Sequence, residues 1–240
     1  MRILVSIGLC LFWFSSQAGE IRIAAAANFY PTLNQIKKEF EKTSQHTVTI
    51  IRGSTGKLFA QIIKGAPYDI FLSADSQRAE KLVEIGRSYD GQSYIYAIGQ
   101  LALWEKDANH SVDIKEKLIS GKFNKLAIAN PKTAPYGYAA IEVLKEMRLY
   151  KQVKSRLVYG ENISQALQFV DSGAADIGFV ARSYVMDDVY YEIDSQLHDP
   201  IKQKMVLLKQ TKEVKIAEEF IQFMQSKKIK ALIKADGYQL

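Results

Sequence analysis

The sequence has very little cysteine and histidine, and it lacks the motifs of common enzyme classes. Cys10 is the only cysteine among 240 residues, so a fold held together by disulfides is excluded. The three histidines, His46, His110 and His198, are scattered through polar segments, where we expect solvated side chains rather than metal ligands. Neither a G-x-S-x-G elbow nor an H-E-x-x-H motif occurs. The sequence therefore indicates no catalytic residue.

The sequence also lacks a hydrophobic run long enough to span a membrane. The longest run, residues 3–14, is shorter than the roughly 20 residues that a spanning helix requires. It follows Arg2 and precedes the small residues Ser16 and Ala18, a pattern typical of a secretion signal. We predict that residues 1–18 are a cleaved signal peptide and that the mature protein is periplasmic, with no membrane insertion after cleavage.

A strong excess of charge of one sign is likewise missing. The formal net charge is +6, and basic residues alternate with acidic ones on the predicted helix faces. A nucleic-acid surface shows a concentrated basic stripe, so no nucleic-acid partner is expected. Because 48% of the residues are hydrophobic, the chain can bury the core of one large domain or of two modest ones.

Short β-prone runs alternate with segments of helical period along the chain, which predicts an α/β fold with largely parallel sheets. Asn28 is a candidate N-cap for the first helix, with Pro31 in its first turn. Two longer β-prone stretches, 94–104 and 190–208, are long enough to cross between domains. Strands are expected over residues 21–26, 47–51, 70–72, 126–129, 157–159 and 175–180, and helices over 57–64, 76–85, 137–148, 162–171, 214–226 and 228–234.

Four polar loops follow predicted strands and precede predicted helices. They are residues 27–28, 53–56, 135–137 and 160–163. The first N–H groups of a helix have no partner within the helix, and the helix dipole adds positive potential at the same end. Loops of this kind therefore favour an anion.

The loop at residues 53–56, Gly-Ser-Thr-Gly, is followed by Lys57 and partly resembles a nucleotide-binding P-loop. The match fails, because the required first glycine falls on Ile51 and the required Ser or Thr after the lysine is Leu58. Taken alone, the loop is better explained as a Gly-rich turn with a Ser or Thr helix cap. An NTPase is not indicated.

Other polar residues have ordinary structural explanations. Asp69 and Asp75 flank a predicted strand, and Asp75 stands where a helix begins, so we expect it to cap that helix. Tyr184, Tyr190 and Tyr191 could suggest phenolate ligands for ferric iron. We interpret them as packing residues, because aromatic residues favour β-prone segments and no accompanying ligand set is visible.

Five segments, in this order, carry a distinctive pattern: AAAANF at 24–29, GSTGKLFAQI at 53–62, GAPYDIFLSAD at 65–75, NPKTAPYGYAA at 130–140 and GENISQALQFVDSGAADIGFV at 160–180. Together they resemble the ModA-type molybdate-binding proteins, a family of periplasmic substrate-binding proteins of ABC transporters. The resemblance implies a two-lobed, type II periplasmic-binding-protein-like α/β fold. Lobe 1 would be residues 19–96 plus 201–240, lobe 2 residues 97–200, and two crossover strands would form the hinge.

The resemblance also implies the ligand and its site. A molybdate or tungstate oxyanion would lie between the lobes, with no cofactor and no directly bound metal cation. The implied contacts are Asn28 and Thr55 through side chain and backbone N–H, with Ser54 and Ala27 adjacent, and Tyr136 and Ile163 through backbone N–H. The implied partner is the permease of an ABC importer, and a monomer is expected.

Two departures from the family pattern bear on the ligand. Asn28 replaces the serine of some relatives, and Ala181 stands where some place a hydroxyl-donating tyrosine. Another tetrahedral oxyanion, such as sulfate, therefore stays an alternative, with selectivity resting on cavity size. A second alternative, of a different class, is a phosphate-handling enzyme whose residues 53–57 cradle a phosphate, with Asp69 or Asp75 assisting.

Overall fold

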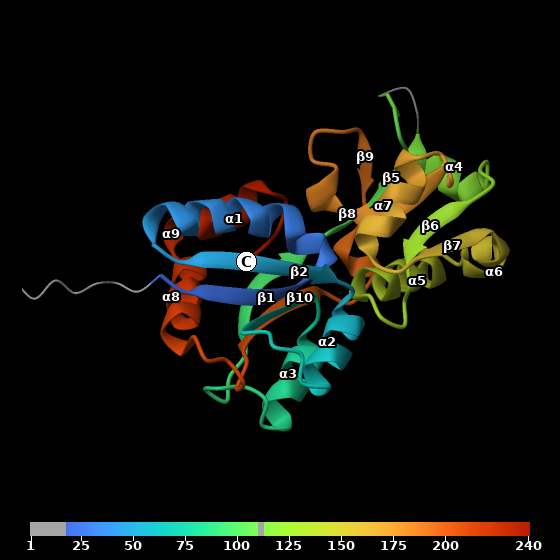
Figure 1. Cartoon of the computed structure of the whole chain (residues 1–240). Helices are drawn as coiled ribbons and strands as arrows, with labels where there is room; N and C mark the ends of the chain where they lie inside the picture. The colour runs from blue at the N-terminus through green and yellow to red at the C-terminus, as the bar shows by residue number, and fades with distance from the viewer. Residues whose placement is uncertain (1–17, 110–112) are drawn as a thin grey trace, which may run out of the picture.

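The computed structural model describes residues 18–109 and 113–240. The predicted signal peptide, except for Ala18, and His110 lie outside the described residues. The chain forms two α/β lobes, each built around a mixed sheet of five strands, on the left and right of Figure 1. The prediction of a two-lobed α/β fold is confirmed.

The sheet of lobe 1 combines parallel strands with strands that return from lobe 2. The strand order is β2 (Thr47–Gly53), β1 (Glu20–Ala26), β3 (Ile70–Ser73), β10 (Ile201–Leu207) and β4 (Tyr94–Gly99). β1 pairs in parallel with β2 and β3, whereas β10 is antiparallel to both β3 and β4. The carboxyl ends of β1, β2 and β3 therefore lie along one edge.

Helices bury both faces of this sheet (Figure 1). Ile21 and Ile23 of β1 pack with α1, α8 and α9, while Ala24 packs with α2 and α3 on the other face. The two-residue alternation follows from the pleat of a strand. The helices are α1 (Tyr30–Thr43), α2 (Thr55–Ile63), α3 (Ser76–Glu84), α8 (Val214–Gln225) and α9 (Lys227–Ala235).

Lobe 2 repeats this plan around one continuous core. Its strand order is β7 (Leu157–Gly160), β6 (Leu126–Ala129), β8 (Ile177–Ala181), β5 (Leu101–Trp104) and β9 (Tyr190–Glu192). β6 is parallel to β7 and β8, and β5 is antiparallel to β8 and β9. The described helices are α4 (Ile114–Ser120), α5 (Pro135–Glu146), α6 (Tyr150–Val153) and α7 (Ile163–Asp171).

The chain crosses between the lobes twice, at the two long β-prone stretches. The first stretch breaks after Gly99, with β4 in the sheet of lobe 1 and β5 in that of lobe 2. The second returns from β9 to β10 across residues 193–200. The predicted division between residues 96 and 97 falls inside β4, which continues to Gly99.

Two details differ from the expectations. Each sheet contains antiparallel pairs, because strands β5 and β10 run back from the crossovers beside parallel strands. The prediction that Asn28 caps the first helix is wrong. A 3₁₀ turn, η1 (Ala27–Phe29), precedes α1, whose N-cap position is Phe29, and the Asn28 side chain is buried in other hydrogen bonds.

Candidate functional site

A small cavity lies between the lobes, where the carboxyl ends of parallel strands from both sheets meet. This is the edge at which open α/β sheets bind ligands. Its volume is about 10 Å³, close to what one water-sized sphere needs. The residues on opposite walls are therefore close enough to contact the same small ligand. The cavity is lined by Ala26, Ala27, Asn28, Gly53, Ser54, Thr55, Ala74, Ala134, Pro135, Tyr136, Asn162 and Ile163. All six expected residues therefore line one cavity.

Three helices begin at this cavity. Ser54 is the N-cap of α2, Ala134 of α5 and Asn162 of α7, and each of these residues lines the cavity. Thr55 and Ile163 are the first residues of their helices, and Tyr136 is the second residue of α5. The N–H groups of a first helical turn have no partner within the helix. The cavity therefore gathers unpaired donors and three positive dipole ends.

Ser54 offers a hydroxyl that nothing else uses. It is 2% exposed, and its Oγ has no hydrogen-bond partner in the described parts of the chain. Although Ser54 occupies the N-cap of α2, its side chain makes no capping bond. A buried, unsatisfied hydroxyl costs about 1–3 kcal/mol. Ser54 thus stands at the predicted cap position but lacks the side-chain capping hydrogen bond, so the cap alone does not explain its hydroxyl.

The neighbouring Thr55 is also set up to donate. Its hydroxyl oxygen accepts a hydrogen bond from the Ala74 N–H at 3.3 Å, which leaves the hydroxyl proton available. Thr55 is 1% exposed and lines the cavity. Lobe 1 thus provides two adjacent hydroxyls at the start of one helix.

Asn28 is held from behind by residues remote in the sequence. Its amide nitrogen donates to Gln203 Oε1 at 2.8 Å, and its nearest other acceptor is Tyr238 Oη at 3.4 Å. Its backbone carbonyl accepts a hydrogen bond from Tyr238 Oη at 2.8 Å. The 3.4 Å hydrogen bond from the Asn28 amide to Tyr238 Oη is longer than the usual N–H···O range, so a charged acceptor in the cavity would compete well for that N–H.

Lobe 2 contributes mainly backbone. The hydroxyl of Tyr136 accepts from Gln203 Nε2 at 3.4 Å, in the buried interior, and burial raises the pKa of Tyr136 well above its ordinary value. The side-chain Oδ1 of Asn162 accepts a hydrogen bond from the Gln165 backbone N–H at 3.1 Å and so caps α7. Ile163 has no polar side-chain atom. Each of these side chains is occupied elsewhere or apolar, so lobe 2 can serve a ligand through the backbone N–H groups at its helix starts.

No charged residue is found among the described residues that line the cavity. An anion there would meet only N–H and hydroxyl dipoles. Hydrogen bonds to an ionised partner are roughly twice as strong as neutral ones, so several neutral donors can hold a dianion without a countercharge.

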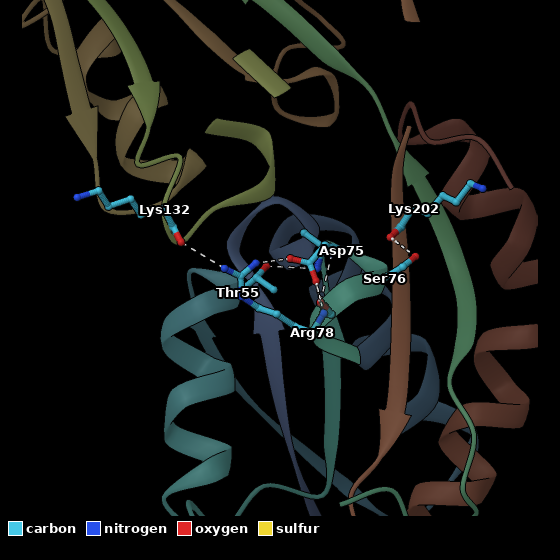
Figure 2. A network of polar contacts seen from close by, with 8 residues as sticks. Thr55, Asp75, Ser76, Arg78, Lys132 and Lys202 are labelled. Carbon is cyan, nitrogen blue, oxygen red and sulfur yellow. Dashed lines mark hydrogen bonds and ion pairs between the residues drawn. The ribbon is translucent and has the colours of Figure 1, made fainter. Parts of the chain in front are cut away.

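Next to the cavity, two hydrogen bonds join the lobes, and we call the residues that make them, Gly56, Arg78, Lys132 and Thr133, the rim. The Gly56 N–H donates to the Thr133 carbonyl at 2.8 Å, and the Arg78 guanidinium donates to the Lys132 carbonyl at 3.2 Å (Figure 2). Arg78 is itself held by Asp75. These bonds join the two lobes beside the lining residues Thr55, Ala74 and Ala134.

A larger groove of about 400 Å³ adjoins this rim. Its walls carry charges of both signs, from Asp75, Arg78, Glu142 and Lys202. A mixed set of charges in an open groove selects no particular ion, so the small neutral cavity is the better candidate site.

Asp69, Asp75 and Ala181 lie outside the cavity. Asp75 accepts from the Arg78 N–H at 2.8 Å, so its predicted capping role is confirmed. Asp69 precedes β3, at the opposite end from the cavity, and accepts from the Arg22 N–H and the Thr211 hydroxyl, each at 2.6 Å. Ala181 ends β8, is fully buried and does not line the cavity.

Several contacts behind the site were not predicted from the sequence, which assigned Tyr184 only a packing role and did not single out Ser183, Gln203 or Tyr238. Tyr184 donates to the Ala27 carbonyl, and Ser183 Oγ lies 3.0 Å from Tyr238 Oη. Gln203 is 0% exposed in β10, where it stands between Lys202 and Lys204. A glutamine between two lysines gives no local sign of burial, so the sequence held no signal for this residue.

The family model described as bacterial extracellular solute-binding protein matches residues 21–239. The chain belongs to this family. Because the family consists of solute-binding proteins, the alternative of a phosphate-handling enzyme is set aside.

Individual relatives agree with this assignment. The chain is 39% identical to the molybdate-binding protein ModA of Azotobacter vinelandii, over 100% of this chain and 97% of that protein. It is also 39% identical to ModA of Rhodobacter capsulatus, over 92% and 88%. The solved structure of the A. vinelandii periplasmic molybdate-binding protein matches with a TM-score of 0.88 at 36% identity, covering 92% and 99%. The resemblance to ModA-type proteins is confirmed.

No helix in the described part of this solute-binding protein is long and apolar enough to cross a membrane.

Proposed function

We propose that the chain captures a tetrahedral oxyanion, molybdate or tungstate, in the interlobe cavity and delivers it to an ABC importer. The observation that carries the proposal is the cavity itself, where three helix N-termini and the unpaired Ser54 hydroxyl converge without any charged side chain. The relatives whose names state molybdate binding support the choice of ion.

In this proposal the ligand is bound by Asn28, Thr55, Tyr136 and Ile163, with Ser54 and Ala27 beside them. Asn28, Ser54 and Thr55 donate from side chains, and Tyr136 and Ile163 donate backbone N–H groups. Phosphate, which keeps a proton near neutral pH, would direct that proton at a donor and lose a bond. Each donor left unsatisfied costs about 1–3 kcal/mol, so a poorly matched ion is rejected.

The two lobes are proposed to act as the halves of a closing receptor, with residues 19–96 and 201–240 in one half and 97–200 in the other. A ligand that contacts both lobes binds the closed arrangement better and shifts the population toward it. The hydrogen bonds of Gly56 and Arg78 at the rim then stabilise the closed form further. The importer's permease would recognise that form.

We further propose that the mature protein is periplasmic and acts as a monomer. Its family is extracellular, and residues of a single chain complete the cavity wall. Light scattering on the purified mature chain tests the monomer, and fractionation of expressing cells tests the location.

Calorimetric titration of the ligand-free protein with molybdate, tungstate, sulfate and phosphate tests the function. We expect molybdate or tungstate to bind most tightly and to stabilise the fold by about 2.7 kcal/mol at a concentration 100 times the Kd. If sulfate binds and the two heavier oxyanions do not, the assigned ligand is wrong. If none of the four binds, the oxyanion function is wrong.

A further inference from the structure

Gln203 lies behind the cavity at an irregular point of its strand. It belongs to β10, is 0% exposed and does not line the cavity. The pairing of β10 with β4 shifts register between Gln203 and Lys204. An irregularity of this kind re-aims a side chain out of the regular alternation. The strand is thus locally distorted where it carries its buried amide.

The Gln203 amide contacts cavity residues of both lobes. Its Oε1 accepts a hydrogen bond from Asn28 Nδ2 at 2.8 Å and lies 2.9 Å from Tyr96 Oη. Its Nε2 donates to Tyr136 Oη at 3.4 Å. Asn28 lies in lobe 1 and Tyr136 in lobe 2. One side chain therefore connects the residues that face each other across the site.

These contacts determine which end of the Asn28 amide faces which partner. Gln203 Oε1 is an acceptor only, so Asn28 must present its nitrogen to it rather than its oxygen. That bond uses one of the two N–H groups and fixes the plane of the amide. The backbone carbonyl of Asn28 is fixed separately by Tyr238 Oη at 2.8 Å. The second N–H of the Asn28 side chain makes only a long hydrogen bond of 3.4 Å, to Tyr238 Oη, in a residue that lines the cavity, so this is the N–H that a ligand would take over.

Gly99 leaves room for this network. A Cβ at Gly99 would lie 2.2 Å from Tyr136 Oη and 2.8 Å from Gln203 Nε2, closer than side chains can approach. Gly99 is the last residue of β4, at the first crossover between the lobes. The network thus passes between the lobes at the point where the chain itself crosses.

We propose that Gln203 is a positioning residue for oxyanion binding, which orients the Asn28 amide toward the ligand and ties it to Tyr136 across the lobes. It acts without touching the ligand, and the inference rests on the proposed function.

A double-mutant cycle on molybdate affinity tests this role. Gln203→Met keeps an unbranched side chain of similar length but removes all three hydrogen bonds of the amide, to Asn28, Tyr96 and Tyr136. We expect Gln203→Met and Asn28→Ala each to weaken molybdate binding about 10- to 100-fold, the range for one hydrogen bond to a charged group. Because both remove the same donor, the double variant should bind within about threefold of the weaker single variant.

Thr211→Val is the matched control. It also removes a buried hydrogen bond of lobe 1, from the Thr211 hydroxyl to Asp69 Oδ1, but at the far end of the sheet from the cavity. It should lower the melting temperature while leaving molybdate affinity within about twofold of wild type. If Gln203 served only the stability of the fold, Gln203→Met would likewise lower the melting temperature and leave molybdate affinity nearly unchanged.

Several results would overturn the proposal. Wild-type molybdate affinity in a folded Gln203→Met protein is one, and losses that multiply in the double variant are another. If Gln203→Met does not fold, Gln203→Asn is used in its place. Asparagine keeps an amide group, but its side chain is one methylene too short to join Asn28 to Tyr136. Wild-type affinity in that variant would equally refute the role. Failure of the unmodified protein to bind any oxyanion would instead refute the proposed function.

Discussion

The two walls of the cavity present donors of opposite kinds. Lobe 1 brings polar side chains, with the unpaired Ser54 hydroxyl, the Thr55 hydroxyl and the Asn28 amide. Lobe 2 brings helix starts whose side chains are apolar or bonded elsewhere, at Tyr136 and Ile163. The difference shows that ligand binding by lobe 1 depends on which side chains are present, whereas ligand binding by lobe 2 depends on the geometry of the backbone. Substitutions should therefore act differently on the two walls.

The largest effect is expected from removing both hydroxyls of lobe 1. In Ser54→Ala/Thr55→Val, two hydrogen bonds to the anion are lost, and oxyanion affinity should fall at least about 100-fold in calorimetry. Ser54→Ala alone should weaken binding while leaving the ligand-free protein as stable as wild type or more so, because its Oγ has no partner to lose. A stability loss with unchanged affinity would show that Ser54 serves the fold instead.

Lobe 2 should respond only when a backbone donor is removed. Ile163→Pro deletes one N–H at the first position of α7, where proline is tolerated, and the preceding Asn162 is already extended with ψ 177°. Oxyanion affinity should fall about 10- to 100-fold.

Ile163→Val is the matched control for that substitution. It keeps the N–H and should bind within about threefold of wild type in the same titration. Equal losses in the valine and proline variants would mean that the Ile163 side chain, not its backbone, matters.

A smaller effect is expected where the two walls touch. In Gly56→Ala, the added Cβ would lie 3.1 Å from the Thr133 carbonyl oxygen and 3.3 Å from the Arg78 guanidinium. This crowds the rim bond that joins the lobes, so affinity should fall about 3- to 10-fold, mostly through faster ligand release. Stopped-flow dissociation measures this directly. An unchanged dissociation rate would show that the hydrogen bonds at the rim do not help to retain the ligand.

The smallest effect concerns pH, because neither wall relies on a charge. Burial raises the pKa of Tyr184 to about 12, and it raises those of Tyr136 and Tyr238 further. A raised phenol pKa stabilises the fold fully below pH 10, and that contribution is lost as pH rises toward 12. Molybdate affinity should thus vary less than about twofold between pH 6 and 9 in calorimetry. A steep change in that window would reveal a titrating group at the site.

Much of the fold could be predicted from local pattern. Most strands were found within a residue or two, because short buried strands such as β6 and regular helical spacing such as that of α1 are strong local signals. The sequence assigned no helix to Ile114–Ser120. Asn28 was misread as a cap, since a polar residue before a helix fits both a cap and a buried turn.

The site was predictable only in part. The strand-to-helix loops indicated an anion, and the family pattern selected individual residues within them. The same Ser54 could equally have capped α2, and only the folded arrangement shows that it does not. Gln203 and Tyr238 were missed because they meet Asn28 from 175 and 210 residues away, a pairing that no local pattern contains.

A crystal structure with tungstate tests the central claim most directly, because the heavy atom identifies its own position by anomalous scattering. One anomalous peak is predicted inside the cavity, with ligand oxygens at hydrogen-bonding distance from Thr55 Oγ1 and from the N–H groups of Tyr136 and Ile163. A peak in the neighbouring groove beside Arg78 and Lys202, or no ordered tungstate in a protein that binds it in solution, would contradict the account.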